Sequence, residues 1–458
     1  MKLWNELKSR MLAHPGRTVG EGNAKMTFED LVIHTEAKAQ KLRGLRCCAI
    51  LCDSEMAAGM ALLACFAAQV TAVPLSRRYG VSHFRRILGC IGPDALLSDG
   101  EDIFTVTPVP DPTYRPPEKH PAVIMCTSGT TGTPKGVMLS EDNLLANLRD
   151  IAAYFGPGED DTILIARPLY HGAVLTGEFL AALWGGADIR FAGGACDPSA
   201  LLRLIDRTRA TVFGGTPTLL CMMARFRRGE QAGSLRRIAV SGECMSRAAG
   251  QKLAVAFPQA EIFHVYGLTE AAPRVAFLPP ALFGEFPDCV GRPLRSVSVR
   301  IVGQDGKPVP QGEEGTLLVR GPNVMLGYYN DPAATRRVLR GGWLDTGDTA
   351  RMNEAGLLQI RGRRDDLIIR AGMNIYPAEI ENALQTDRRV REAVAYGFLS
   401  PTGQTQIGLK IAGDFADEAE IRALCGRVLP AYEIPCRIEW LPSLARNGSG
   451  KLVRRAPQ

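Results

Sequence analysis

The sequence predicts an α/β protein with two unequal domains, and three changes of pattern along the chain support this prediction. From about Pro121 to His264, short β-branched runs alternate with longer helical patterns, which is typical of parallel sheets covered by helices. After Pro293, short strands punctuated by glycine predict a small antiparallel or barrel-like unit. From about Arg363 onward, strands and helices in mixed order indicate a compact α+β unit. We therefore expect a large N-terminal domain at residues 1–362 and a small, mobile C-terminal domain at residues 363–458.

The individual elements follow from hydrophobic periodicity. In the first region the expected strands are residues 122–127, 162–166, 210–215, 237–242 and 260–267, and the expected helices are residues 140–155, 177–186 and 216–226. In the second region the expected strands lie within residues 297–310, 315–322 and 356–363. In the third region the expected strands are residues 366–370, 392–399, 405–412 and 436–440, and the expected helices are residues 377–385 and 415–428.

Composition narrows the class of protein. The chain has 46% hydrophobic and 22% charged residues, as soluble globular proteins do. Its net charge of +6 is spread without a long like-charge block, so it gives no indication of nucleic-acid binding. Twelve cysteines stand at irregular spacings without a C-x-x-C pair, which argues against a disulfide framework and against a zinc site. We expect reduced thiols in a cytoplasmic protein.

Two N-terminal segments were considered as membrane segments, and neither pattern predicts insertion into a membrane. The first residues scatter charges among apolar side chains and lack the apolar core of a signal peptide. Met56–Ser76 carries no charge over about the length of a membrane span, but it is rich in alanine and contains Gln69 and Pro74. We interpret it as a buried helix followed by a short buried strand.

The most informative segment is the loop TSGTTGTPKG at residues 127–136, which follows an apolar strand and precedes a helix that Ser140 can cap. Its hydroxyls and glycine amides can donate several hydrogen bonds to phosphate oxygens, and Lys135 adds a positive charge. The spacing differs from that of a Walker A loop, because Pro134 and Gly136 stand where Gly and Ser or Thr are needed. The alternative is an ordinary flexible loop.

This loop resembles the signature of the adenylate-forming superfamily, which includes acyl- and aryl-CoA synthetases, non-ribosomal adenylation domains and firefly luciferase. The acyl-CoA synthetase type is the most similar. Further segments that resemble the family's motifs follow in order over essentially the whole chain: Tyr266–Glu270, Gly342–Asp348, Gly362–Asp366, Gly372–Glu381 and Gly448–Lys451. Each motif alone is weak, and the ordered set is specific.

The resemblance implies a reaction in which a carboxylic acid and ATP form an acyl-adenylate with release of pyrophosphate, followed by transfer of the acyl group to the thiol of coenzyme A. The site must neutralise the charge of the phosphates and hold the attacking oxygen in line. The resemblance assigns the ATP-binding residues as Thr127, Ser128, Gly129, Thr130, Thr131, Gly132, Lys135, Tyr266, Asp348 and Arg363. It places Thr269 at the phosphates and assigns Glu270 to Mg²⁺, a hard ion that prefers carboxylate oxygen.

The small C-terminal domain is expected to serve both half-reactions. By resemblance Lys451 reaches the carboxylate and the α-phosphate in the first half-reaction. The residues that precede it, Ala445–Gly448, differ from the Pro-Arg-Thr type of sequence that relatives have at this point. Asp365 matches the family's hinge, with a solvated charge cluster at residues 364–366 as the alternative. Gly372 fits a close approach of pantetheine, and a simple hairpin glycine fits the sequence equally well.

The acyl pocket is expected to draw on four segments. The candidates are Tyr170, His171, Phe213, Gly214, Ser241, Gly242, Gly267 and Ala272. His171 is interpreted as a catalytic or gating residue, with a hydrogen-bonded structural histidine as the alternative. Amino-acid-activating relatives place an Asp near this position, and no acid occurs between Arg167 and Thr176, which favours a substrate without an α-ammonium group. Arg274 is interpreted as a surface or structural residue, with pairing to a polar substituent of the substrate as the alternative.

Three functions remain open at this point. The first is ligation of a fatty, aryl or keto acid to coenzyme A. The second is loading of such an acid onto the phosphopantetheine arm of a carrier protein. The third is a non-catalytic nucleotide-binding protein, against which the presence of Lys135, Glu270, Asp348 and Lys451 argues. An oxygenating luciferase is related but is supported by no residue here.

Overall fold

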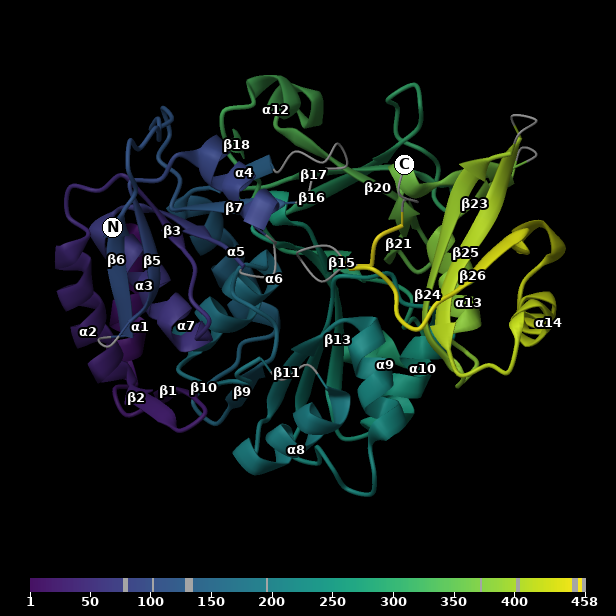
Figure 1. Cartoon of the computed structure of the whole chain (residues 1–458), viewed down its shortest axis with the longest axis horizontal. Coiled ribbons are helices and arrows are strands. Elements are labelled where there is room, and N and C mark those ends of the chain that lie inside the picture. Colours follow the sequence, from purple (N-terminus) through teal and green to yellow (C-terminus); the bar gives the residue numbers. More distant parts are fainter. Residues whose placement is uncertain are drawn as a thin grey trace.

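The computed structural model describes residues 1–76, 81–100, 103–127, 135–194, 197–370, 373–400, 404–446 and 452–454. Two large sheets, a smaller antiparallel sheet and a separate C-terminal group of elements make up this part of the chain (Figure 1). The first large sheet, sheet A, has the order β15-β14-β13-β12-β11-β9-β10-β1-β2. Its strands are β1 (Thr18–Glu21), β2 (Ala24–Thr27), β9 (Thr162–Ile165), β10 (Asp188–Phe191), β11 (Val212–Gly215), β12 (Arg237–Val240), β13 (Glu261–Gly267), β14 (Arg274–Leu278) and β15 (Arg292–Pro293).

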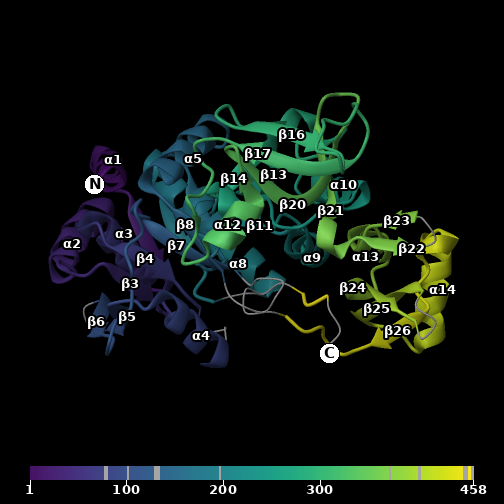
Figure 2. The ribbon, with the colours of Figure 1, turned by 90° about the horizontal axis from the view of Figure 1, so that it is seen from above.

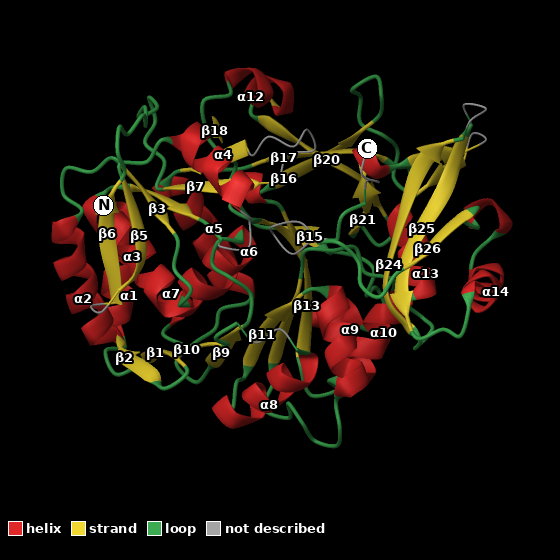
Figure 3. Cartoon of the chain, in the orientation of Figure 1, coloured by secondary structure: helices red, strands yellow, loops and turns green. Residues whose placement is uncertain are grey.

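The centre of sheet A is parallel, as the alternating pattern predicts. Strands β1, β10, β9, β11, β12 and β13 run parallel to their neighbours, and β2, β14 and β15 are antiparallel at the edges. Three capped helices gather beside β11–β13 (Figure 3). They are α8 (Pro198–Thr208), α9 (Pro217–Phe226) and α10 (Arg247–Ala256), and their N-caps are Asp197, Thr216 and Ser246.

The second large sheet, sheet B, has the order β18-β8-β7-β4-β3-β5-β6. Its strands are β3 (Cys47–Ile50), β4 (Thr71–Pro74), β5 (Ala95–Gly100), β6 (Ile103–Pro108), β7 (Val123–Thr127), β8 (Lys135–Leu139) and β18 (Gly327–Tyr328). The N-terminal helices are α1 (Lys2–Ala13), α2 (Phe28–Lys41), α3 (Glu55–Ala68), α4 (Val81–Ile91) and α5 (Glu141–Tyr154). A further helical segment consists of α6 (Gly172–Val174), the π-helical turn η2 (Leu175–Leu180) and α7 (Ala181–Gly185).

One continuous hydrophobic core joins both sheets to the helices between them. It includes Leu63 of α3, Val123 of β7, Leu148 of α5 and Ile163 of β9, each fully buried. The uncharged stretch Met56–Ser76 therefore forms a buried helix and the buried strand β4, as expected. Among the described residues no helix has the length and apolar character needed to cross a membrane.

Strand β8 corrects one expectation. The loop at residues 127–136 was expected to precede a helix capped by Ser140, with no strand predicted between them, but Lys135–Leu139 pairs antiparallel with β7 before the helix begins. The predicted cap is confirmed, because Asn143 N donates to Ser140 Oγ at 3.1 Å and the Asn143 side chain accepts from Ser140 N at 2.8 Å.

Sheet C is antiparallel, as the glycine-punctuated pattern predicts. Its order is β16-β17-β20-β19, with β21 paired to β20. The strands are β16 (Ser298–Val302), β17 (Gly315–Arg320), β19 (Leu339–Arg340), β20 (Trp343–Met352) and β21 (Leu358–Arg363). The short helices α11 (Pro280–Phe283) and α12 (Pro332–Val338) precede β15 and β19.

The C-terminal elements have a hydrophobic core of their own, to which Ile375, Ile380, Leu409 and Ile421 contribute. They are β22 (Ile368–Arg370), β23 (Met373–Ile375), α13 (Pro377–Leu384), β24 (Val390–Leu399), β25 (Thr405–Gly413), α14 (Glu418–Val428) and β26 (Arg437–Trp440). Figure 2 shows them grouped at the end of the molecule opposite α1 and α2.

Polar contacts attach this C-terminal group to sheet C. Arg361 of β21 forms an ion pair with Glu379 of α13, and its Nε donates to Glu314 at 2.8 Å. The Tyr376 hydroxyl donates to the same Glu314 carboxylate at 2.7 Å.

Candidate active site

Sheets A, B and C meet around the turn η3 (Thr269–Ala271), which joins β13 to β14. The backbone N–H of Met325, just before β18 of sheet B, donates to the carbonyl of Glu270 at 2.9 Å. The hydroxyl of Tyr266, near the end of β13, donates to Asp348 of sheet C. The turn that carries Thr269 and Glu270 therefore lies where three sheets converge.

Buried amide side chains hold this turn in shape. Ala272 has a φ of 60°, in the left-handed region that alanine seldom occupies. The fully buried Asn323 donates from Nδ2 to the carbonyls of Ala271 at 2.8 Å and Arg274 at 2.9 Å, and Asn147 bonds both the N–H and the carbonyl of Arg274. These bonds compensate the local backbone strain, which is a common feature of functional turns.

The first group of site residues, the aspartate cluster, consists of Tyr266, Asp348 and Arg363. Antiparallel pairing of β20 and β21 places Asp348 directly opposite Arg363. The Tyr266 hydroxyl donates to Asp348 Oδ2 at 2.5 Å, and Arg363 Nη1 donates to Asp348 Oδ1 at 3.2 Å. Burial raises the pKa of Asp348, while the Arg363 guanidinium acts to lower it. Burial, together with the Asp348 charge, raises the pKa of Tyr266 well above its usual range.

The second group, the glutamate cluster, consists of Lys135, Glu270 and Tyr328. The Tyr328 hydroxyl donates to Glu270 Oε1 at 2.9 Å, and Lys135 Nζ lies 4.9 Å from the centre of the Tyr328 ring. Burial and the neighbouring Glu270 raise the pKa of Tyr328. Tyr328 was not predicted from the sequence, since its place depends on the pairing of β18 with β8.

The two clusters adjoin. The charge of Glu270 acts on both Asp348 and Arg363, and the charge of Arg363 acts on Tyr328. Two carboxylates and two cationic side chains thus share one region of the molecule. Such an arrangement suits a ligand that carries phosphates, hydroxyl groups and a divalent cation.

Thr127 ends β7 opposite Lys135, and its hydroxyl lies 3.5 Å from the Lys135 carbonyl. The expected phosphate-binding residues Ser128, Gly129, Thr130, Thr131 and Gly132 lie outside the described residues. The same is true of the expected thiol-acceptor residue Gly372 and of Lys451.

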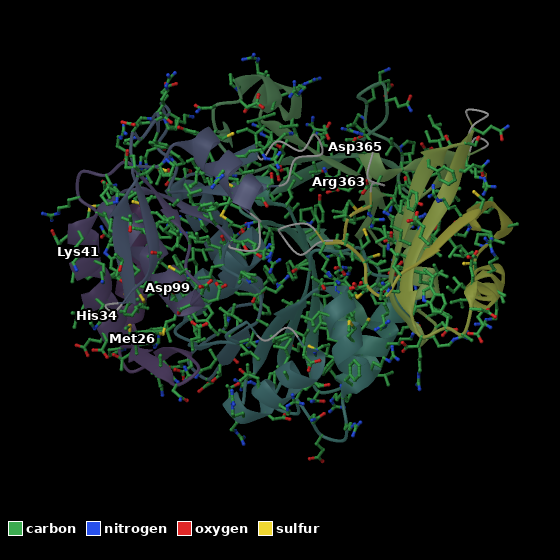
Figure 4. All side chains as sticks on the ribbon, viewed as in Figure 1. Met26, His34, Lys41, Asp99, Arg363 and Asp365 are labelled. Carbon is green, nitrogen blue, oxygen red and sulfur yellow. The ribbon has the colours of Figure 1, made fainter. Side chains whose placement is uncertain are left out.

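Asp365 lies in the exposed turn η4 (Arg364–Asp366) between β21 and β22. Figure 4 shows it near Arg363, where sheet C meets the C-terminal elements. The neighbouring Arg364 forms an ion pair with Asp345 at 3.1 Å.

Most of the expected acyl-pocket residues lie near η3 and the adjoining ends of strands. Ser241 follows β12, Gly267 ends β13, and Ala272 follows η3. Gly242 has a φ of 96°, which requires glycine at this position. Tyr170 and His171 immediately precede α6, with ring centres 4.4 Å apart.

Phe213 requires a correction. Its side chain is fully buried in the core formed with α8 and α9, whereas Gly214 faces η2 on the other side of β11. Successive side chains of a strand point to opposite faces, so only Gly214 of this pair lies toward the pocket segments. For Arg274 the surface interpretation is wrong, because the residue is 2% exposed, whereas this burial agrees with the structural interpretation.

Tyr170 in addition lines a cavity of about 150 Å³ between the ends of β3, β4 and β9. Its other lining residues include Cys52, Asp53, Glu55 and Ser76, and the remaining acyl-pocket candidates do not line it. The cavity is therefore distinct from the group of residues around η3.

The residues present fit Mg²⁺. Among the described residues no group of three or more His, Cys, Asp and Glu side chains could hold a metal. Mg²⁺ commonly takes one or two carboxylates from the protein and its other ligands from phosphates and water. Glu270, positioned by Tyr328, offers such a carboxylate beside Lys135.

Comparisons with known proteins agree with this geometry. The family of AMP-binding enzymes matches residues 7–329. The feruloyl-CoA synthase of an Amycolatopsis species is 32% identical, over 98% of this chain and 97% of the relative. The 2-succinylbenzoate–CoA ligase of Bacillus licheniformis is 31% identical, over 98% of each chain.

Solved structures lead to the same family. The o-succinylbenzoate CoA synthetase of Bacillus subtilis, in complex with its acyl-adenylate intermediate, has a TM-score of 0.86 and 28% identity, and the match covers 98% of this chain and 97% of that one. The amide bond synthetase of Marinactinospora thermotolerans has a TM-score of 0.83 and 27% identity, over 99% and 98% of the two chains. This chain belongs to the AMP-binding enzyme family of the adenylate-forming superfamily and is of the acyl-CoA synthetase type.

Proposed function

We propose that this protein is an acid–thiol ligase that activates a carboxylic acid as an acyl-adenylate and transfers the acyl group to coenzyme A. The observation that carries the proposal is the meeting of the aspartate and glutamate clusters around η3. Their members come from β8, β13, η3, β18, β20 and β21. Together they bring side chains that can bind phosphate, ribose hydroxyls and a metal ion into one place. The activities of similar ligases agree with it.

In the first half-reaction, a carboxylate oxygen of the acid forms a bond to the α-phosphorus of ATP. The bond from that phosphorus to the bridging oxygen breaks, and pyrophosphate leaves with the electron pair. In the second half-reaction, the sulfur of the thiol attacks the acyl carbon, AMP departs and the thiol proton passes to solvent. Hydrogen-bond donors that are positioned around the phosphate oxygens accelerate both steps.

We assign the residues of the nucleotide site as follows. Lys135, Thr269 and the loop from Thr127 to Gly132 hold the phosphates, and Tyr266 lies near the adenine. Asp348 accepts hydrogen bonds from the ribose hydroxyls, and Arg363 is the second ribose ligand. Support comes from the buried Asp348 carboxylate, which Tyr266 and Arg363 fix in position.

Glu270 would hold Mg²⁺. When bound there, the ion would neutralise phosphate charge and favour departure of pyrophosphate. The chain itself orients the Glu270 carboxylate through the Tyr328 hydroxyl and places Lys135 against the ring of the same tyrosine.

We further propose that residues 1–362 and 363–458 act as two domains that rearrange between the half-reactions. The separate hydrophobic core of the C-terminal elements supports this division. Lys451 would assist attack on the α-phosphate, Asp365 would serve as the hinge and Gly372 would line the path of the thiol. The polar contacts of Arg361 and Tyr376 would stabilise one of the two arrangements.

The acyl group would lie among Tyr170, His171, Gly214, Ser241 and Gly242, close to Gly267 and Ala272. Gly242, where a Cβ atom would meet no atom closer than 3.7 Å, leaves room for a ring or a short chain. We place His171 at the entrance, beside the reacting carboxylate.

We propose coenzyme A as the acceptor and the cytoplasm as the location, with the phosphopantetheine arm of a carrier protein as the alternative acceptor. Among the described residues no cysteine forms a disulfide bond, which agrees with a reducing compartment.

Carboxylate-dependent exchange of labelled pyrophosphate into ATP tests the first half-reaction. We expect exchange with at least one member of a panel of fatty, aryl and keto acids. Lys135→Ala should lower the exchange rate at least about tenfold, since a preorganised donor to the phosphates is lost. Lys410→Ala is a matched control, because Lys410 also lies over a tyrosine ring, 5.5 Å from that of Tyr396, but in the C-terminal sheet.

Thioester formation then identifies the acceptor. Coenzyme A and a holo carrier protein are supplied separately to enzyme that has been charged with its acid. Exchange that is absent with every acid, or equally fast in the Lys135 variant, would contradict the proposal.

A further inference from the structure

Three charged side chains are buried together between β9, η2 and β14. We call Arg167, Glu178 and Arg274 the buried charge cluster. Arg167 Nη2 lies 2.5 Å from Glu178 Oε1. Glu178 is 1% exposed and Arg274 is 2% exposed, while the Arg167 side chain is 15% exposed. Charged residues are seldom buried to this extent without a function or a full set of partners.

The cluster directly adjoins the proposed acyl pocket. Arg167 Nη1 lies 3.4 Å from the hydroxyl of Ser241. A Cβ atom at Gly214 would collide with the Glu178 carboxylate, and a Cβ atom at Gly177 would lie 2.6 Å from Arg274 Nη2. The two glycines therefore provide the space in which the carboxylate and the guanidinium lie.

The π-helical turn η2 accounts for the inward position of Glu178. A π turn adds one residue to a helical turn and rotates the following side chains, and such turns occur often at functional sites. Each residue of η2 is buried, so Glu178 lies in the protein interior rather than in solvent.

The cluster is incompletely satisfied. Glu178 forms an ion pair with Arg167, and its charge also acts on Arg274, which has Tyr154 as a hydrogen-bond partner. Burial together with the charge of Arg167 lowers the pKa of Arg274. Among the described residues, Arg167 Nε, Arg274 Nε and Glu178 Oε2 are buried without a hydrogen-bond partner. A cluster with a purely structural role would be expected to have its polar atoms paired, since each unpaired buried atom is costly.

The unpaired atoms comprise two donors and one acceptor. A hydroxyl group donates one hydrogen bond and accepts two, so it has the complementary capacity. A carboxylate only accepts, and it would face the negative charge of Glu178. A long alkyl chain would leave all three atoms unpaired.

We propose that the buried charge cluster recognises a hydroxyl group on the acid substrate, at the end remote from the carboxylate that is activated. The inference rests on the proposed function, because it places the acyl group in the pocket beside Ser241 and Gly214. The substrate class is then a compact hydroxy acid, aromatic or aliphatic, rather than a long-chain fatty acid.

Pyrophosphate release by the full-length enzyme with Mg²⁺ and ATP tests this assignment. The aliphatic probes are hexanoate, 6-hydroxyhexanoate, adipate and dodecanoate, and the aromatic probes are 3-phenylpropanoate and its 4-hydroxyphenyl analogue. We expect kcat/KM to be at least about tenfold higher for the hydroxy acid of one series than for its unsubstituted counterpart, because a site built to bond a hydroxyl rejects an analogue that lacks it.

Variants link the preference to the cluster. Glu178→Leu should reduce the ratio of hydroxy to unsubstituted acid to about one, and Glu178→Gln should reduce it by less. Arg46→Gln is a matched control, since Arg46 Nη2 lies 2.5 Å from Asp94 Oδ1 in a part-buried pair just before β3 and β5. Its ratio should equal that of the parent enzyme. Thermal unfolding identifies variants that have not folded. If Glu178→Leu does not fold, the ratio is measured in Glu178→Gln instead.

Each other result has a defined meaning. Equal or better use of the unsubstituted acid, or an unchanged ratio in the folded Glu178 variants, overturns the inference and leaves the proposed function in place. A preference for adipate overturns the hydroxyl assignment. Absence of pyrophosphate release with every acid overturns the proposed function, and the inference with it.

Discussion

Replacing Asp348 with asparagine removes one charge from the proposed ribose site with little change of shape. In the structure the carboxylate accepts hydrogen bonds from Tyr266 at 2.5 Å and from Arg363 at 3.2 Å. The amide keeps one acceptor oxygen, so one of these bonds is lost together with the charge. A hydrogen bond to a charged group contributes about 1.5–3 kcal/mol. If Asp348 also binds the ribose hydroxyls, affinity for ATP should fall by about ten- to a hundredfold.

The assay is the rate of pyrophosphate release as a function of ATP concentration at saturating acid. We expect the KM for ATP of Asp348→Asn to rise about ten- to a hundredfold, while the KM for the acid changes little. Asp345→Asn is a matched control on the same strand, because Asp345 pairs with the exposed Arg364 at 3.1 Å. A folded Asp348 variant with the parental KM for ATP would refute the assignment of this residue to the nucleotide.

Three further predictions concern other parts of the molecule. Lys451→Ala should abolish formation of the acyl-adenylate and spare thioester formation from supplied acyl-adenylate. Lys307→Ala is the control and should affect neither half-reaction, because the Lys307 side chain is 82% exposed. Equal loss of both half-reactions in the Lys451 variant would contradict the division of roles. Glu270→Gln should raise the Mg²⁺ concentration that gives half-maximal pyrophosphate release at least about tenfold, and an unchanged Mg²⁺ requirement would exclude Glu270 as a ligand. Burial lowers the pKa of His264 from 6.5 to about 4, so the unfolded chain binds the proton first as the pH falls. Stability present above pH 6.5 is therefore lost between pH 6.5 and 4, by about 3 kcal/mol for this group, and denaturant unfolding of His264→Asn should show a weaker dependence on pH in that window.

The sequence predicted single residues of the nucleotide site better than their contacts. Asp348 and Arg363 stand 15 positions apart, and their resemblance to family motifs indicated both. Their direct contact requires the register of β20 with β21, which includes a bulge between Thr349 and Ala350. A pattern of apolar residues does not determine the position of a bulge.

Tyr328 and Glu178 could not be predicted in the same way. Tyr328 belongs to the short strand β18, and its contact with Glu270 depends on pairing with β8, about 190 residues earlier in the chain. Glu178 lies in a segment expected to be a regular helix, and the π turn directs it inward. Phe213 is different, since the alternation of side chains along a strand could have separated it from Gly214.

Attack of a carboxylate oxygen of the substrate on the α-phosphorus of ATP leaves an isotopic record in the products. A substrate acid labelled with ¹⁸O in its carboxylate is converted with ATP and coenzyme A, and the products are analysed by mass spectrometry. One ¹⁸O atom is expected in AMP, because the acyl carbon–oxygen bond breaks when the thiol attacks. Label in inorganic phosphate with formation of ADP, or unlabelled AMP, would contradict it.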